Sequence, residues 1–248
     1  MSKVVIEALY PEFNNLYGDR GNLLYLRRKL ELAGAEVELL ETPLFETPAF
    51  AARDDVGFLY LGPCTERQQE LELEALRPYR EALLERMNGN AITLATGNAF
   101  ELFGEKILRA DPQKSEIEAL GFWNTYAERF SRLRYNELCV GECGDIRVTG
   151  FKNQLSHSYG ETPAPFLTMH TGTGLNPQSK LEGAHAGNFY ATYLLGPLLA
   201  LNPPFASRLL AALYPGAEEV ELPFEWEAYE KRLAELSDPA VNHPKHHA

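Results

Sequence analysis

The fold is decided by two apolar runs that each end in a glycine: Val56-Gly57-Phe58-Leu59-Tyr60-Leu61-Gly62 and Ala91-Ile92-Thr93-Leu94-Ala95-Thr96-Gly97. Nearly continuous apolar runs of this length are typical of parallel strands that are buried on both faces. A helical pattern follows each run, over residues 66–87 with a break at Pro78, and from residue 99 onward. We therefore expect two neighbouring parallel strands, with Gly62 and Gly97 at the same edge of the sheet.

The surrounding sequence continues the alternation of strands and helices. Strands are expected over residues 4–9 and 36–40, and a helix over 22–32 that Gly34 ends. Such βαβ alternation predicts an α/β fold: a mostly parallel sheet with helices on both faces. The second half favours short strands that add to the sheet in antiparallel fashion, followed by two helices: 120–126, 137–140, 146–151 and 166–169, then 205–214 and 223–236. We expect one domain over residues 1–236 and a flexible tail over 237–248.

Composition excludes several classes of protein. Lys and Arg number 23 and Asp and Glu 35, so the net charge is −12, and 45 % of the 248 residues are hydrophobic. The apolar fraction rules out a disordered chain, and the acidic balance argues against a nucleic-acid surface. Apolar runs stay well below the ~20 residues of a membrane span, and residues 1–6 lack the pattern of a signal peptide. A cytoplasmic protein without a cofactor is expected.

Residues 93–104 are the main candidate for a catalytic turn. A buried strand that turns sharply into a helix is the geometry of a nucleophile elbow, whose apex residue lies at the carboxyl edge of the sheet. The apex is expected at Gly97, which carries no nucleophile. The alternative is a plain strand–helix turn that uses glycine for its backbone freedom.

The segment Gly62-Pro63-Cys64-Thr65-Glu66-Arg67-Gln68-Gln69 has two interpretations. A loop that opens a helix presents backbone N–H groups to an anion, although Pro63 removes one donor. Alternatively, Thr65 with Gln68 or Gln69 caps the helix. Cys64 is either a thiolate near the helix N-terminus or an inert buried side chain.

The remaining cysteines and histidines form no clear catalytic or metal-binding pattern. Cys139 and Cys143 have no second Cys/His pair nearby, so we expect no metal site. His157, His170 and His185 lie in turn-rich segments, where histidine is most often a surface or capped side chain.

Several segments together resemble the class I glutamine amidotransferases of the cobyric acid synthase (CobB/CobQ) type, and within them the glutaminase subunits of lipid II isoglutaminyl synthase. Residues 4–214 follow the family's order of motifs. The motif segments are Asn15-Leu16-Tyr17-Gly18-Asp19-Arg20-Gly21-Asn22, the 62–69 loop, Glu118-Ala119-Leu120-Gly121-Phe122, Gly150-Phe151-Lys152-Asn153 and Thr192-Tyr193-Leu194-Leu195-Gly196-Pro197-Leu198-Leu199. The resemblance implies the flavodoxin-like fold of that family.

The resemblance also implies a chemistry, and this sequence departs from it. In the family an elbow cysteine attacks the side-chain amide of glutamine, a histidine is its base, and backbone N–H groups bind the oxyanion. The cysteine position falls on Gly97 and the histidine position on Leu195. The oxyanion loop corresponds to Gly62, Pro63 and Cys64. Arg132 aligns with the arginine that holds the glutamine.

Two hypotheses follow. The first is a pseudoenzyme that binds a partner, a Mur-ligase-like ATP-dependent subunit, and that retains a site for glutamine or a related small carboxylate. The second is a working glutaminase subunit of peptidoglycan or cobamide synthesis, with Cys64 as a displaced nucleophile and His157 or His185 as its base. The aromatic C-terminal residues Phe224, Trp226 and Tyr229 are candidate anchors for an interface with the partner. Alternatively, they pack on the chain's own core.

Overall fold

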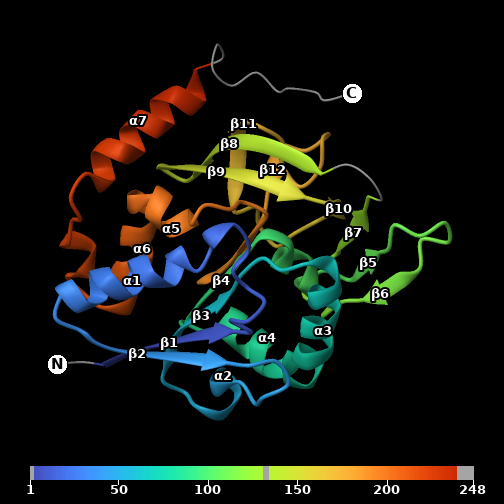
Figure 1. Ribbon diagram of the computed structural model, residues 1–248, viewed down its shortest axis with the longest axis horizontal. Coiled ribbons are helices and arrows are strands. Elements are labelled where there is room, and N and C mark those ends of the chain that lie inside the picture. Colours follow the sequence, from blue (N-terminus) through green and yellow to red (C-terminus); the bar gives the residue numbers. More distant parts are fainter. Residues whose placement is uncertain (1–2, 131–133, 239–248) are drawn as a thin grey trace.

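A six-stranded sheet forms the centre of the computed structural model, which describes residues 3–130 and 134–238 (Figure 1). The strand order is β13-β14-β4-β3-β1-β2. The strands from β14 to β2 run parallel, and only β13 pairs in the antiparallel direction. Their bounds are β1 (Lys3–Leu9), β2 (Glu36–Thr42), β3 (Val56–Leu61), β4 (Ile92–Thr96), β13 (Ala184–Ala186) and β14 (Phe189–Thr192).

The two apolar runs pair as the sequence predicts. β3 and β4 are parallel neighbours, with Phe58 opposite Ile92 and Leu61 opposite Ala95. All five residues of β4 are buried, because helices cover both faces of the sheet. Gly62 and Gly97 follow directly at the same carboxyl edge, which confirms the expected arrangement.

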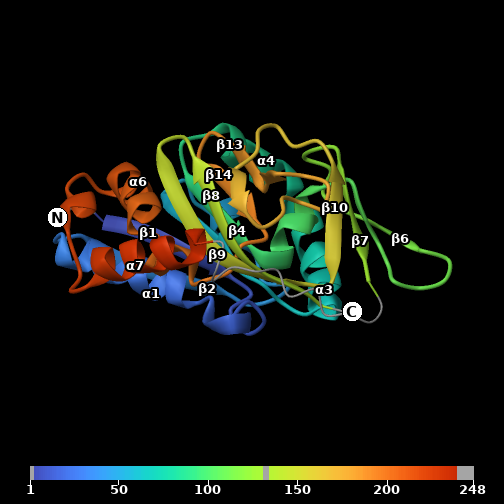
Figure 2. The same cartoon turned by 90° about the horizontal axis from the view of Figure 1, so that it is seen from above.

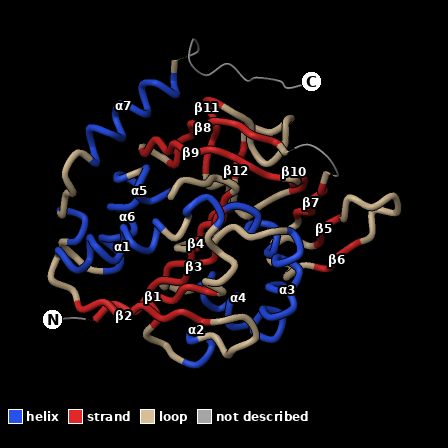
Figure 3. Tube along the Cα trace, in the orientation of Figure 1, coloured by secondary structure: helices blue, strands red, loops and turns tan. Residues whose placement is uncertain are grey.

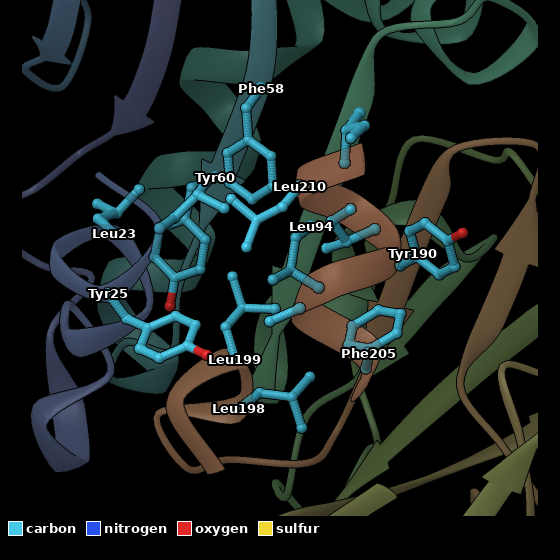
Figure 4. Close-up of a cluster of buried hydrophobic side chains, with 14 of the residues drawn as sticks. Leu23, Tyr25, Phe58, Tyr60, Leu94, Tyr190, Leu198, Leu199, Phe205 and Leu210 are labelled. Atoms are coloured by element: carbon cyan, nitrogen blue, oxygen red, sulfur yellow. The ribbon is translucent and has the colours of Figure 1, made fainter. Parts of the chain in front are cut away.

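Helices cover both faces of the sheet and enclose two hydrophobic cores (Figure 3). Side chains of α1, α5 and α6 pack on one face, where Tyr60 and Leu94 meet Leu198 and Phe205 (Figure 4). Side chains of α2, α3 and α4 pack on the other. The helices are α1 (Gly21–Leu32), α2 (Ala49–Ala52), α3 (Glu66–Leu76), α4 (Arg80–Asn88), α5 (Leu198–Leu201), α6 (Pro203–Leu213) and α7 (Glu225–Ser237), with 3₁₀ turns η1 (Leu16–Gly18), η2 (Arg77–Tyr79), η3 (Gly97–Phe103) and η4 (Ala217–Glu219).

The second half departs from the predicted arrangement. Apart from β13 and β14, the strands after β4 form two separate four-stranded sheets and do not extend the central one. One sheet has the order β10-β7-β5-β6 and the other β12-β11-β8-β9. Their bounds are β5 (Lys106–Leu108), β6 (Glu116–Glu118), β7 (Thr125–Arg129), β8 (Tyr135–Cys143), β9 (Ile146–Gln154), β10 (Ser156–Gly160), β11 (Leu167–Thr171) and β12 (Leu181–Glu182).

The prediction of a strand over residues 120–126 is wrong for residues 120–124. β7 begins only at Thr125, because the backbone N–H groups of Leu120 and Phe122 donate to carbonyl groups at the end of η3. By contrast, Pro78 does interrupt the helix predicted over 66–87, which splits into α3 and α4 around η2.

Ser237 belongs to α7, and residues 239–248 lie outside the described residues. Within the described ranges no helix is long and apolar enough to cross a membrane.

Helix α7 lies beside α1 in the view of Figure 2, and a buried ion pair joins the start of α7 to α1. Lys29 Nζ lies 2.8 Å from Glu225 Oε1, and the two side chains are 1 % and 5 % exposed. The Tyr25 hydroxyl donates to the other carboxylate oxygen at 2.7 Å. Removing one member of such a pair leaves a buried charge without its partner.

We expect Lys29→Met to lower the free energy of unfolding by about 3–5 kcal/mol in urea denaturation. The double variant Lys29→Met/Glu225→Gln should recover most of this loss, because the amide keeps an acceptor for Tyr25. Lys3→Met at the exposed Lys3–Glu38 pair is the control and should leave the free energy of unfolding almost unchanged. Equal losses for the two lysine variants would contradict the assigned role of the buried pair.

Candidate functional site

A small cavity lies where the loops after β3, β4 and β14 meet. Pro63 and Cys64 line it from the first loop, Gly97 and Asn98 from the second, and Leu195 from the third. Its volume is about 20 Å³, which is room for about one water molecule. The structure thus brings together the residues predicted for the nucleophile, the base and the oxyanion loop. None of the described residues that line the cavity is a histidine.

Gly97 is closely packed, and its backbone has a left-handed conformation. It has φ +61°, in the left-handed region that favours glycine. A Cβ atom on Gly97 would lie 2.6 Å from Pro63 Cβ and 3.0 Å from Leu195 Cδ2. Pro63 and Leu195 therefore occupy the space that a side chain at position 97 would need.

The loop after β3 offers few free backbone donors. Pro63 has no N–H group, and the Cys64 N–H donates to Asn98 Oδ1 at 3.1 Å. The Asn98 amide nitrogen donates back to the Cys64 carbonyl at 2.9 Å. This pair of hydrogen bonds joins the two loops and uses the donor that an oxyanion would require.

The start of α3 follows the capping interpretation of the sequence. Thr65 and Gln68 form a reciprocal capping box, in which each side chain accepts from the other residue's backbone N–H. Two donors at this helix end are thereby satisfied within the protein.

Cys64 is buried and its thiol is held in the neutral form. Burial is the main cause that raises the pKa of Cys64, and the neighbouring Glu72 adds to it. A thiolate is the nucleophilic form of cysteine, so the Cys64 thiol is poorly suited to attack an amide. The inert interpretation of Cys64 agrees with this environment.

The two histidines considered as bases lie elsewhere. His157 packs edge-on against Phe130 and Tyr135, and burial lowers its pKa to about 4. His185 stacks on Tyr190 with a ring-centroid separation of 4.7 Å. Neither histidine lines the cavity with Cys64. No group of three metal-ligating side chains occurs within residues 3–130 and 134–238.

A buried polar network supports the floor of the cavity. Glu101 accepts hydrogen bonds from Gln69 at 3.0 Å, from Tyr193 at 3.1 Å and from Ser156. Burial raises the pKa of Glu101, and the hydrogen bond from Ser156 offsets part of this effect. Arg129 extends the network by donating to Gln69 at 2.7 Å. No local pattern in the sequence links Ser156 or Tyr193 to Glu101, so their place in this network is visible only in the structure, although Tyr193 lies in one of the motif segments.

The mouth of the cavity carries a second polar cluster. Arg134 Nη1 donates to Asn153 Oδ1 at 2.9 Å and to the Tyr17 hydroxyl at 3.0 Å. Tyr17 donates to the same Asn153 oxygen at 2.7 Å. Arg132, the residue predicted to hold glutamine, lies outside the described residues.

Comparisons with known proteins agree with this geometry. The sequence model of the family described as the CobB/CobQ-like glutamine amidotransferase domain matches residues 4–203 of this chain. The chain belongs to that family. A crystal structure of a glutamine amidotransferase superposes with a TM-score of 0.51 at 12 % identity, over 84 % of this chain and 98 % of that one, and shows that the fold is shared.

Two curated proteins are similar to this chain along most of their length. Lipid II isoglutaminyl synthase (glutamine-hydrolyzing) subunit GatD of Staphylococcus aureus (strain N315) is 27 % identical over 228 residues, covering 91 % of this chain and 89 % of the relative. The subunit of the same name from Streptococcus pneumoniae (strain ATCC BAA-255 / R6) is 25 % identical over 242 residues, covering 93 % and 87 %.

We expect Gly97→Ala to cost about 2–5 kcal/mol in urea denaturation, the sum of left-handed backbone strain and overpacking against Pro63. Gly121→Ala is the matched control, since Gly121 has φ +65° with nothing within 4 Å of its Cβ position. It should show the strain alone, about 1–2 kcal/mol.

Gly97→Ala in a Pro63→Gly background isolates the effect of the contact between position 97 and Pro63. There the penalty of Gly97→Ala should fall toward that of Gly121→Ala, because the clashing Cβ atom of Pro63 is gone. An unchanged penalty in the two backgrounds would show that Pro63 does not fill the space at position 97.

Proposed function

We propose that this CobB/CobQ-like protein is a pseudoenzyme that binds a partner and no longer hydrolyses glutamine. The observation that carries the proposal is the packing at the elbow, where Pro63 and Leu195 fill the space of a side chain at position 97. Gly97 supplies no thiolate and Leu195 supplies no base. The Cys64 N–H already donates a hydrogen bond to Asn98 Oδ1. Loss of a nucleophile or base in such sites lowers turnover by about 10⁶-fold.

The environment of Cys64 argues against the displaced-nucleophile alternative. Its thiol is neutral and neither His157 nor His185 lines its cavity. Glutamine would also need far more space than about 20 Å³ to bring its amide to Cys64.

We propose a Mur-ligase-like ATP-dependent subunit as the partner. The support is that both curated relatives are named as subunits of lipid II isoglutaminyl synthase, which favours cell-wall amidation over cobamide synthesis. Of the aromatic residues considered as anchors, Phe224 is 77 % exposed. Tyr229 is buried and donates to the Arg147 carbonyl, so it packs on the protein's own core.

We also propose that the cavity mouth retains affinity for a small carboxylate, with Arg132 as its anchor. A guanidinium pairs with a carboxylate through two parallel hydrogen bonds. Arg134, two residues further along, already places one guanidinium at the mouth, which supports a cationic entrance.

The purified protein should release no ammonia from glutamine above background. Gly97→Cys alone should also be inactive, because the introduced thiol lacks both space and a base. The triple variant Pro63→Gly/Gly97→Cys/Leu195→His restores all three features and should gain measurable ammonia release. Wild-type turnover that Cys64→Ser abolishes would favour the working glutaminase.

The partner hypothesis is tested with the Mur-ligase-like ATPase of the same organism. Light scattering should detect a complex, and the complex should amidate lipid II with ammonium chloride but not with glutamine. Calorimetry should detect glutamine or glutamate binding that Arg132→Ala abolishes and that Arg28→Ala, on the exposed side of α1, preserves. A strictly monomeric protein that binds neither amino acid would refute both parts.

A further inference from the structure

The mouth of the cavity continues into an exposed apolar patch on the hairpin of β8 and β9. Leu138 of β8 lies directly opposite Phe151 of β9, so the two side chains are neighbours on one face of the hairpin. The Tyr17 ring packs edge-on against Phe151, with the ring centroids 5.9 Å apart. Leu138 is 45 % exposed and Tyr17 40 %. These three residues, Tyr17, Leu138 and Phe151, are called the mouth patch below.

Helix α7 covers the other end of the same hairpin. It packs against β8, β9 and β11, and its Tyr229 hydroxyl donates to the Arg147 carbonyl. Val140 and Thr149, which lie opposite each other between Arg147 and the mouth patch, are fully buried. Figure 1 shows the end of the hairpin at which β8 begins extending past α7 toward β10. The mouth patch lies at that end and is left exposed by the described part of the chain.

The side chain of Tyr17 is fixed in position within the patch. Its hydroxyl donates to Asn153 Oδ1 at 2.7 Å and accepts from Arg134 at 3.0 Å. Its backbone has φ +62°, in the left-handed region that non-glycine residues rarely adopt. Backbone strain of this kind is concentrated at functional sites. A side chain that is already fixed loses little conformational entropy on binding, which suits an anchor residue of an interface.

Arg134 supplies the charge at the border of the mouth patch. Its guanidinium donates to the neutral groups of Tyr17 and Asn153, and it forms no ion pair with any residue that the structure describes. The other border residue, Asn136, lies opposite Asn153 and is also neutral. In a chain with a net charge of −12, this leaves an unpaired cation beside an exposed apolar surface. Charge complementarity therefore favours an occupant that brings a carboxylate.

A second copy of this chain fits the mouth patch poorly. In a two-fold pairing the same surface meets itself, so two Arg134 guanidinium groups would enter an interface to which the patch and its border contribute no carboxylate. A different protein can supply both the apolar contact and the opposite charge.

We propose that the mouth patch is the docking site for the ATP-dependent partner, and that the partner presents an apolar side chain bordered by carboxylate groups. This inference rests on the partner role proposed above and adds the surface and its chemistry. Leu138 and Tyr17 pack against the apolar side chain, and Arg134 pairs with a carboxylate.

The mouth patch is joined to the elbow through the backbone. The Phe151 N–H donates to the Leu195 carbonyl at 3.2 Å, and the Leu195 N–H donates to the Phe151 carbonyl at 2.9 Å. Leu195 in turn packs at position 97. A partner bound to Phe151 therefore contacts a residue that is hydrogen-bonded to the filled elbow.

The test measures the Kd of the full chain for the recombinant Mur-ligase-like ATPase of the same organism by calorimetry. Leu138→Asp should weaken the complex by about 30-fold or more, the loss that is typical of a hot-spot residue. Leu181→Asp is the matched control, because Leu181 is 50 % exposed on β12, at the opposite edge of the same sheet. It should leave the Kd unchanged. Both leucines are exposed, so both variants should keep the thermal unfolding of the wild type.

The charge of the patch is tested separately. Arg134→Glu should weaken the complex by about tenfold or more at low salt and make its Kd less sensitive to salt. Arg28→Glu changes the net charge equally on the exposed side of α1 and should do neither. In the wild-type complex, hydrogen exchange of the backbone amides of residues 135–139 and 150–153 should slow.

The outcomes separate this inference from the proposed function. A wild-type chain that forms no complex would refute the docking site together with the partner role. A complex that tolerates both Leu138→Asp and Arg134→Glu, or that only Phe224→Asp weakens, would overturn the docking site alone. A wild-type dimer that Leu138→Asp dissociates would identify a second copy as the occupant and would also overturn it.

Discussion

The parallel pairing of β3 with β4 is the constraint on which the rest of the site depends. Its register places the ends of two buried strands side by side, so the loops that begin at Gly62 and Gly97 must share one small volume. Backbone hydrogen bonds and burial on both faces fix this register, since a slip by one residue would turn apolar side chains away from their cores. The packing of Pro63 against Gly97 and the paired hydrogen bonds of Cys64 and Asn98 follow from this closeness, and Leu195 reaches the same volume from β14, which pairs with β4 on its other side.

Because the loops share this volume, the residues at positions 63, 97 and 195 are packed against one another. In an active elbow of this family, the space above the turn holds a thiol and its base. Here a proline and a leucine fill that space, and a glycine makes room for them. Asn98 then ties the two loops by paired hydrogen bonds. The result is a well-packed turn held by Pro63, Leu195 and Asn98.

Buried carboxyl groups organise the same edge of the sheet. Asp19 accepts hydrogen bonds from Tyr60 and Thr96 and so joins the segment before α1 to the ends of β3 and β4. Glu101 does the same for the floor of the cavity. These groups accept hydrogen bonds from donors in distant parts of the chain.

The sequence by itself determined strands β1 to β4 of the central sheet, helices α1, α3 and α4, and the positions that meet at Gly97. These features depend on local signals: apolar runs, helical periodicity, turn glycines and motif order. Only the tertiary structure decided the two outer sheets, because strands such as Ser156–Gly160 are short and polar and are defined by their partners. It also decided the pairing of Glu101 with Ser156 and Tyr193, since burial and hydrogen bonding between distant residues leave no local trace in the chain.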